Sequence, residues 1–486
     1  MTCTERDESE APARKRQRIE TRCSANDRSC DSQTAQSQLE RCSEELEIRA
    51  PSARSSTLIS LEDLQEADFP WTIIHERAYS IEEFIPSHPG GPLIWRCVGE
   101  DATELFDAHH SSKVARAVLE RYEIGHIAQV QSKTGPYRTE LSRRAAKYLK
   151  APTLPLAEAI ACGMLVMFVL WASLAYIGGW MALNVALSWF WSRHLDAGLH
   201  SAVHGDFSYS KVMHKRLLQT YSLLSHHMLD YYQGGNDGKG LSQHYQHHLF
   251  TNDILRDPDM TDFAGGRNWI RRHPCNPWQE YNEWQGLYWL AALCILEPVT
   301  ELLTMIAACV MGALQLMEPP ADAAIFKARW KDVVSWWIEA LLSPEYQGAA
   351  FFFQPWQHAL GGLLMAKAIA KLVLLPFVEV QHFLVPDPPE GSGDEEFLVT
   401  QLRTTANLKL QHPVARMLDF LMFHGDSLQV AHHLWPAVSF TQLRGLSSVL
   451  QEACAELGLP YHEVGYWEAF SKVRLQIKQH ARKPAE

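Results

Sequence analysis

The apolar and polar positions divide the chain into membrane-length apolar runs and strongly polar stretches. From Leu154 to Trp191 the sequence is almost continuously apolar, and Gly178-Gly179 interrupts this run. A helix needs about 20 apolar residues to cross a bilayer, and the run is roughly twice that length. It therefore predicts two helices joined by a tight turn, with both ends of the hairpin on one side of a membrane.

A second apolar zone covers Leu287–Met317, but it contains Glu297 and Glu301. Acids inside a membrane are costly, so part of this zone is expected at the interface. Val333–Leu342 is a weak candidate span, and His358–Val380 is a better one. If the histidine groups on either side share one metal site, the chain must cross an even number of times between them. The pattern therefore predicts about four transmembrane helices, with one weak candidate at the interface.

The remaining stretches suggest a domain order. The first 65 residues are too polar to bury a core and have no apolar segment typical of a cleavable signal peptide. Aromatic and aliphatic residues then return, and a short basic linker leads to the membrane part. We expect a disordered tail at 1–65, a small folded domain at 66–130, a linker at 131–153, a membrane domain at 154–475 and a tail at 476–486.

Composition narrows the chemistry. The net charge of −12 argues against a nucleic-acid surface, which needs a basic footprint. The 10 cysteines include no CxxC pair, so we interpret them as reduced thiols and not as a disulfide framework. The 23 histidines are unusually many, and several stand in tight groups, which favours metal binding.

One histidine pattern lies in the small domain. His88 is followed by Pro89-Gly90-Gly91, a rigid turn that can aim an imidazole into an apolar crevice, and His109-His110 follows some twenty residues later. Two axial histidines on haem suit electron transfer because no position is left open for oxygen. The segment resembles a cytochrome b5 domain.

The resemblance to cytochrome b5 implies specific haem ligands. It implies His88 as one axial ligand and His110 as the other, with His109 as the fallback. His75 and His126 are interpreted as surface or core histidines.

Three further histidine groups follow the first hairpin. They read HxxxH, HxxHH and QxxHH, and residues three or four apart share one face of a helix. Each group can thus present two or three ring nitrogens to a common point. Imidazole suits iron, zinc and copper alike, so spacing alone does not name the metal.

The surroundings of these groups add a resemblance. Asp257-Pro258-Asp259 follows the second group, Leu434-Trp435-Pro436 follows the third, and Gln401 lies upstream of it. The whole resembles the membrane fatty-acid desaturase superfamily, and Gln429 with the fused haem domain places it with the front-end desaturases. The resemblance implies two bound irons and these metal residues: His200, His204, His244, His247, His248, His382, Gln429, His432 and His433.

Some positions depart from the family pattern. Ser201 stands where an acid usually follows the first histidine, which removes a partner that would orient a ligand imidazole. Asp196 and Asp206 are candidate substitutes. The pair His226-His227 is interpreted as non-ligating, and His194 and His424 are unassigned.

The resemblance implies an α+β cytochrome b5-like haem domain followed by an all-α integral membrane domain with a cytosolic histidine-box cap. The expected activity is insertion of a cis double bond into polyunsaturated acyl chains carried on phospholipid or coenzyme A, using O2. Electrons would come from NADH through cytochrome b5 reductase to haem b, at the endoplasmic reticulum. A sphingoid-base desaturase or a hydroxylase could use the same scaffold. A membrane haem electron carrier with structural zinc, or a scaffold protein, is a more remote alternative.

Overall fold

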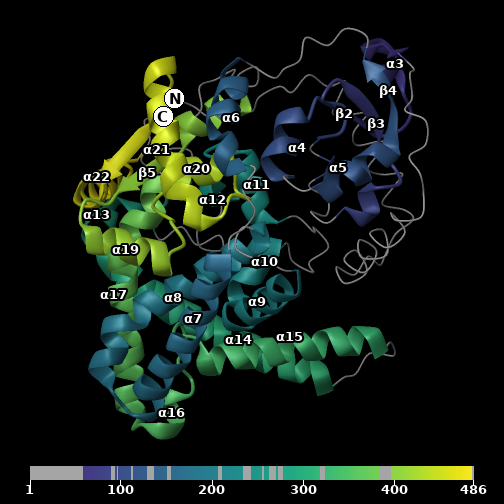
Figure 1. Cartoon of the computed structure of the whole chain (residues 1–486). Helices are drawn as coiled ribbons and strands as arrows, with labels where there is room; N and C mark the ends of the chain where they lie inside the picture. Colours follow the sequence, from purple (N-terminus) through teal and green to yellow (C-terminus); the bar gives the residue numbers. More distant parts are fainter. Residues whose placement is uncertain are drawn as a thin grey trace.

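The structure is a computed structural model, and it places an amino-terminal domain beside a larger helical domain (Figure 1). It describes residues 58–88, 94–95, 97–110, 113–127, 136–149, 155–205, 211–233, 242–253, 257–261, 270–271, 277–317, 323–382 and 396–483.

The amino-terminal domain is built on a four-stranded sheet of order β1-β4-β3-β2. Strand β1 pairs with β4 in parallel, and the other neighbours are antiparallel. Every residue of β2 is buried, as expected for its apolar sequence WTII. The elements are β1 Leu58–Ile59, α3 Leu61–Glu66, β2 Trp71–Ile74, β3 Arg77–Ser80, α4 Thr103–His109, α5 Lys113–Leu119 and β4 Glu123–Ile127.

The sheet begins earlier than the polarity pattern suggested. Strand β1 and helix α3 lie before residue 66, and a capping box between Ser60 and Asp63 starts α3. Leu64 of α3 is buried among Trp71, Ile73 and Ala78, so this short helix covers part of the sheet.

The helical domain has a bundle of α7, α8 and α17 below a cap of shorter helices (Figure 1). The bundle and its neighbours are α7 Pro155–Ala172, α8 Met181–His204, α9 Lys211–Leu224, α13 Gln285–Ala291, α14 Glu297–Met317, α15 Ala323–Leu342, α16 Ala350–Phe353 and α17 Trp356–His382. The cap contains α6 Pro136–Leu149, α10 Leu229–Gln233, α11 Gln243–Leu249, α12 Pro258–Thr261, α18 Phe397–Thr404, α19 Pro413–Met422, α20 Gln429–Leu434, α21 Phe440–Leu457 and α22 Tyr466–Gln479. A two-stranded parallel sheet, β5 Ala406–Lys409 with β6 His462–Gly465, joins it.

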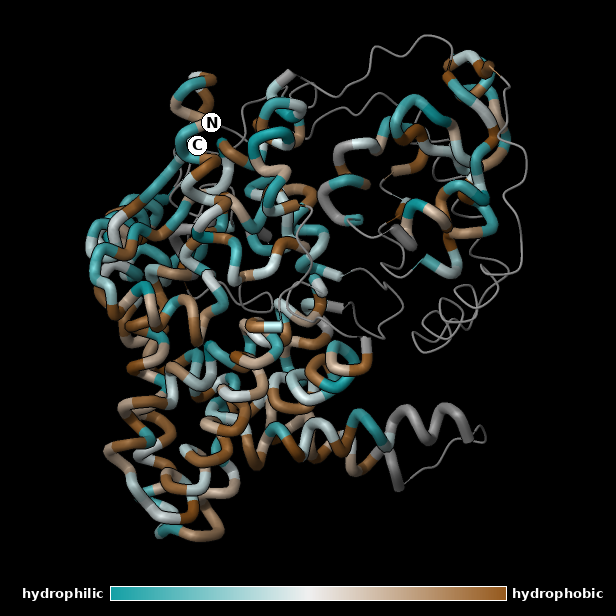
Figure 2. The backbone as a smooth tube through the Cα atoms, in the orientation of Figure 1, coloured by the Kyte–Doolittle hydropathy of each residue, from teal (hydrophilic) through white to brown (hydrophobic). Residues whose placement is uncertain are grey.

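Among the described residues, three helical stretches are long and apolar enough to cross a membrane. They are Pro155–Ile177, Glu280–Leu314 and Trp356–Phe377. The predicted turn at Gly178-Gly179 is confirmed, because the first stretch ends at Ile177 and α8 begins at Met181. Figure 2 shows apolar residues concentrated on the helices of the lower part of the molecule, away from the cap.

The fourth predicted span, α8, does not meet the same criterion. Its polar side chains Asn184 and Ser188 are buried, and both bond to Gln347 in the turn that follows α15. Helix α8 also packs along α17 (Figure 1). The polar face of α8 therefore contacts other parts of the protein and not lipid. For this reason α8 can contain polar residues that a lipid-facing helix would lack. The weak candidate Val333–Leu342 lies in α15 and is not a candidate span either.

The acids of the second apolar zone are paired. Lys367 of α17 contacts Glu301 at 2.8 Å and Glu345 at 2.6 Å, and Lys371 contacts Glu301 at 2.6 Å. Glu297 lies 3.4 Å from Lys371. Two lysines on one helix thus neutralise acids from a neighbouring helix and turn, which is how charges inside a membrane domain are usually tolerated.

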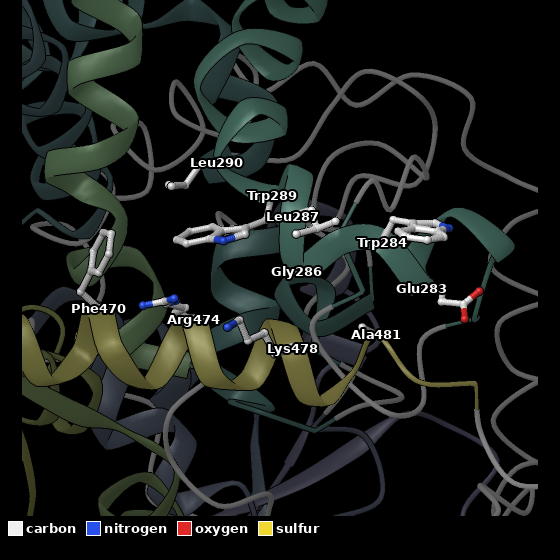
Figure 3. Close-up of a pocket in the computed structure, with 10 residues that line it drawn as sticks. All are labelled: Glu283, Trp284, Gly286, Leu287, Trp289, Leu290, Phe470, Arg474, Lys478 and Ala481. Carbon is white, nitrogen blue, oxygen red and sulfur yellow. The ribbon is translucent and has the colours of Figure 1, made fainter.

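A groove of about 580 Å³ lies between α13 and α22. Figure 3 shows Arg474 and Lys478 of α22 on one side, with Trp284 and Trp289 on the other. It lies beside the first part of the candidate span Glu280–Leu314. Tryptophan and basic side chains are enriched at membrane–water interfaces, so this level of the molecule fits the headgroup region.

Candidate metal centre and haem-binding site

The first histidine group lies on the last turns of α8. His200 and His204 are one helical turn apart, with ring centres 4.8 Å from each other. Gly205 ends the helix directly after His204 in a left-handed conformation, with φ at 69°. Close packing of α8 on α9 fixes this end of the helix, because a Cβ on Gly198 would lie 2.2 Å from the ring of Tyr221.

The second and third groups lie on short helices whose histidines are all buried. Ser242 caps α11 by accepting a hydrogen bond from the Tyr245 amide, which starts the helix just before His244. All six residues of α20 are buried, including His432 and His433. A fully buried helix can hold imidazoles without water only if they are neutral or bound to a partner.

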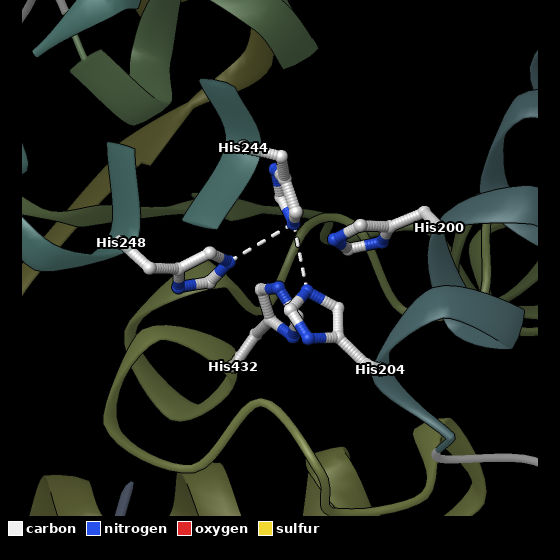
Figure 4. A group of neighbouring side chains, drawn as sticks. All are labelled: His200, His204, His244, His248 and His432. Atoms are coloured by element: carbon white, nitrogen blue, oxygen red, sulfur yellow. Dashed lines mark hydrogen bonds between the residues drawn. The ribbon is translucent and has the colours of Figure 1, made fainter. Parts of the chain in front are cut away.

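Five of the predicted metal residues meet at one point. His200, His204, His244, His248 and His432 each direct a ring nitrogen to within 4.8 Å of the others, among the residues that the structure describes (Figure 4). The Nε2 atom of His244 lies 2.7 Å from that of His204 and 3.1 Å from that of His248. The rings come from α8, α11 and α20, which are far apart in sequence.

The cluster favours neutral imidazoles. Burial, together with the neighbouring imidazoles, holds the pKa values of His244 and His248 well below the usual range. Neutral rings keep a lone pair for a cation, and rings packed this closely would repel one another if charged. The donor set therefore fits a transition metal such as iron, zinc or copper.

His247 and His433 lie next to the cluster and have partners of their own. Nδ1 of His247 is 2.9 Å from Asp257, and Asp259 lies 3.6 Å away. Burial disfavours the charged ring, but these two acids raise the pKa of His247 to about 9. His247 is 5.0 Å from His433 between ring centres, so the two sit on the same side of the cluster.

Two residues that sequence patterns left without a role hold His433. Its Nδ1 lies 3.1 Å from Oε1 of Gln401 and 3.2 Å from Oγ1 of Thr251. The amide nitrogen of Gln401 donates to the backbone oxygen of His248 at 3.0 Å. Gln401 therefore connects α18 to both the second and the third histidine groups. The sequence around Gln401 belongs to a recognisable motif, but which residues Gln401 contacts depends on how the chain folds.

The other predicted metal residues stand as follows. The side-chain nitrogen of Gln429 donates to Oδ1 of Asp426 at 3.0 Å. Helix α17 ends at His382, whose side chain lies outside the described part of the structure. Ser201 is buried and bonds to Nδ1 of His424 at 2.9 Å. Ser201 thus ties α8 to the loop before α20.

Three remaining histidines have structural surroundings. His194 bonds to the Met422 carbonyl at 3.3 Å and to the Tyr221 hydroxyl at 3.2 Å. His226 packs its ring on Trp336. His227 contacts the buried Glu339 through its ring, and its backbone nitrogen donates to the same carboxylate at 3.1 Å.

The His227–Glu339 contact predicts a pH-dependent stability. Burial disfavours the charged ring, but Glu339 raises the pKa of His227 to about 9. The pKa of histidine in an unfolded chain is about 6.5. The pair therefore stabilises the fold fully below that pH, and the stabilisation is lost as the pH rises through about 9. We expect the midpoint temperature of unfolding of the purified protein to decrease as the pH is raised from about 7 to about 9.5. The variant His227→Gln should lack this part of the pH dependence.

The size of this effect is limited by solvent, because the His227 side chain is 26% exposed. Losing the contact should therefore cost about 1–3 kcal/mol at pH 7. Thermal unfolding followed by tryptophan fluorescence measures it, with His358→Gln on the exposed start of α17 as the control. An equal pH slope in His227→Gln and wild type would show that the pair does not titrate as argued.

The amino-terminal domain holds a second facing histidine pair. The ring centres of His88 and His110 are 6.0 Å apart. His88 follows the short helix Ile85–Ser87, and His110 follows the end of α4, where its Nδ1 lies 3.2 Å from the Phe106 carbonyl. Burial lowers the pKa of His110, so its ring is neutral and can ligate a metal.

The surroundings of this pair are apolar. Phe106 stacks on His110 at 4.7 Å, and the adjoining core includes Ile74, Ile81 and Ala102. Two imidazoles facing each other against an apolar wall fit a six-coordinate haem. The side chain of His109 lies outside the described residues, as does the turn Pro89–Gly91. His75 hydrogen-bonds to Asp107 at 2.9 Å, and His126 lies 3.7 Å from Glu123, as expected for histidines away from the haem.

The five described cysteines, which are Cys97, Cys162, Cys294, Cys309 and Cys454, are free thiols. This agrees with the interpretation of the cysteines as reduced in that part of the chain.

Comparisons with known proteins cover both domains. The cytochrome b5-like heme/steroid binding domain family matches residues 57–128, and the fatty acid desaturase family matches residues 200–465. Delta(8)-fatty-acid desaturase 2 of Arabidopsis thaliana is 24% identical and aligns over 85% of this chain and 90% of its own length. Acyl-lipid (8-3)-desaturase B of Dictyostelium discoideum is 23% identical over 81% and 86%. Fatty acid desaturase 3 of Bos taurus is 23% identical over 88% and 95%.

No solved structure matches the chain. The desaturase family match covers more than half of the 486 residues and contains all three histidine groups. With the haem-binding domain in front and three apolar stretches of membrane length, the chain belongs to the fatty acid desaturase family as a membrane-bound oxidoreductase with a fused cytochrome b5 domain.

Proposed function

We propose that this protein is a front-end acyl-lipid desaturase. It would insert a cis double bond into a polyunsaturated acyl chain, between an existing double bond and the carboxyl end, on a phospholipid or on coenzyme A. The observation that carries the proposal is the convergence of five imidazoles, three of them buried and two half-buried, from three helices above the apolar bundle. The relatives named for acyl-lipid and fatty-acid desaturation support the same substrate class.

Two irons are the proposed metals. The five-histidine cluster would bind one iron or share both irons. The neighbouring His247 and His433, together with His382, would supply the remaining ligands. Bound iron would supply the activation of O2 that an unactivated methylene requires, because no side chain can break such a bond by acid–base chemistry. Gln429 would act at the edge of the site, directly or through water.

The chain's own residues would orient the ligands and exclude water. Burial of α11 and α20 keeps bulk water from the rings. Asp257 fixes the ring of His247, and Gln401 with Thr251 fixes that of His433. Such partners set the tautomer of a ligand imidazole and raise its basicity, and they are usually needed for tight metal binding.

Asp257→Asn is therefore expected to lower iron content and desaturation together. Asparagine keeps the shape of the side chain but is a weaker acceptor for the Nδ1 proton of His247. Loss of a partner of this kind typically costs about 10–100-fold in metal affinity or activity. Iron per protein, measured by plasma mass spectrometry, and product yield should both fall, whereas Asp253→Asn in the same loop should resemble wild type. Full iron loading in Asp257→Asn would contradict this role.

The amino-terminal domain would supply the electrons. We propose that His88 and His110 hold haem b, and that cytochrome b5 reductase passes electrons from NADH to it. The His88–His110 ring distance of 6.0 Å and the apolar wall beside the pair support this assignment. A location in the endoplasmic reticulum, with haem and histidine groups on the cytosolic side, follows from the need for that reductase.

The function is tested by expression in yeast that is fed single polyunsaturated fatty acids of different chain lengths. Gas chromatography of the total lipids should reveal one new cis double bond on the carboxyl side of an existing one. Rapid sampling of separated phospholipid and acyl-coenzyme A pools identifies the carrier, because the product forms first on the true substrate. The absence of a new double bond with every acid would refute the proposal.

A further inference from the structure

Arg138 occupies an unusual position at the start of α6, between the two domains. Its residue surface is only 7% exposed, although it lies near the beginning of a surface helix. Arginine is almost never buried unless it is paired. Its neighbours should therefore show what this part of the chain is built to hold.

The partner of Arg138 comes from the other domain. Its guanidinium contacts the carboxylate of Asp107 on α4, and its backbone nitrogen donates to Glu396, directly before α18, at 3.1 Å. Burial would raise the pKa of the Asp107 carboxyl, but His75, Arg138 and Arg116 hold it below its usual range, so Asp107 stays charged. One residue thus bridges the amino-terminal domain and the cap of the helical domain.

This contact lies between the two redox sites. Asp107 lies on α4, and His110 follows directly after the end of this helix, three residues further along the chain. Helix α4 packs against α18, and the two domains meet on this side of the molecule (Figure 1). Gln401 of α18 then bonds to His433 and to the backbone of His248. A haem ligand and the histidine cluster are therefore connected through two packed helices.

We propose that the Asp107–Arg138 ion pair, which joins α4 to α6, is the docking contact that holds the haem domain beside α18, so that electrons pass to the metal centre within one chain. The inference rests on the proposed function. Each double bond requires two electrons from the donor, because O2 takes four in forming two waters with two added protons, and the two broken C–H bonds supply the other two. One ferrous haem gives one electron and becomes ferric, so the domain must be in position twice per double bond.

The test is a charge swap in the full-length, haem-loaded protein. Asp107→Arg and Arg138→Asp each place like charges at the contact, whereas the double variant restores an opposite pair. Hydrogen–deuterium exchange reports docking without any dependence on activity. Faster exchange is expected in α4 and α18 of each single variant, with recovery in the double variant. Glu140→Gln, which removes two ion pairs within α6, is the matched control.

The electron-transfer step is measured separately. Protein with pre-reduced haem is mixed with O2 and acyl substrate, and haem reoxidation is followed by stopped-flow absorbance. Reoxidation should slow about tenfold or more in each single variant, the change that corresponds to loss of a charge-assisted hydrogen bond. Haem absorbance and reduction by the reductase should stay unchanged, and the double variant should recover.

The outcomes separate the two proposals. Unchanged exchange and reoxidation in both single variants would overturn the docking role, even if the wild type desaturates normally. Arg138→Asp leaves the contacts of Asp107 with His75 and Arg116 in place, so unchanged exchange and reoxidation in this variant alone would also overturn the docking role. Variants that change exchange as expected in a protein that makes no double bond would support docking and refute the proposed function.

Discussion

His432→Ala is expected to abolish formation of the new double bond and to lower the iron content of the protein. His432 contributes one of the five nitrogens in the cluster, with its ring centre 4.6 Å from that of His200 and 4.8 Å from that of His248. Losing a ligand should exceed the roughly 10–100-fold effect of losing a ligand's partner. Product is measured by gas chromatography in the fed yeast, and iron by plasma mass spectrometry.

The control for this variant is a histidine away from the cluster. His358→Ala, on the exposed first turn of α17, should keep both iron and activity. Haem absorbance should be equal in the two variants, since the amino-terminal domain does not contain either residue. Desaturation by His432→Ala at the level of His358→Ala would mean that the cluster is not the metal centre.

The histidine groups were predictable because helical spacing is local. His200 and His204, or His244 and His248, must share a helix face wherever the helix lies. The meeting of these faces could be expected only from resemblance, since it depends on how α8, α11 and α20 pack. The structure brings five of the predicted residues to one point and places His247 and His433 beside it.

The partners of the histidines could not be predicted from spacing. Gln401 lies 32 residues before His433 in the chain, and His424 lies 223 residues after Ser201. Helical or strand spacing cannot predict a contact between residues so far apart in the sequence. Ser201 departs from the family pattern, and its hydrogen bond goes to His424, which is not one of the predicted metal residues.

Hydropathy described the membrane part incompletely for a related reason. The mean hydropathy of a helix indicates whether it spans a membrane only if most of its side chains face lipid and not other parts of the protein. Helix α8 has Asn184, Ser188 and Ser192 buried against other parts of the protein, so its low hydropathy reflects those contacts. Conversely, Glu301 lowers the hydropathy of a candidate span, although Lys367 and Lys371 pair with it.

His110→Ala is expected to remove haem from the amino-terminal domain and to abolish desaturation while iron stays bound. The ring of His110 faces His88 across 6.0 Å and stacks on Phe106, so its loss leaves only the His88 side of the pair. Haem absorbance per protein should fall to the background level, and no product should form in fed yeast. His88→Ala should behave in the same way, because either ligand alone leaves the haem with one axial bond.

His109→Ala provides the matched control, since it removes the neighbouring imidazole from the last residue of α4. The His109→Ala variant should keep haem and activity if His110 is the ligand. Loss of haem in His109→Ala, with haem kept in His110→Ala, would mean that His109 is the ligand. Comparison with His432→Ala then separates delivery of electrons from their use. One variant should lose haem and keep iron, and the other should lose iron and keep haem. Because both stop product formation, neither site alone can account for the activity.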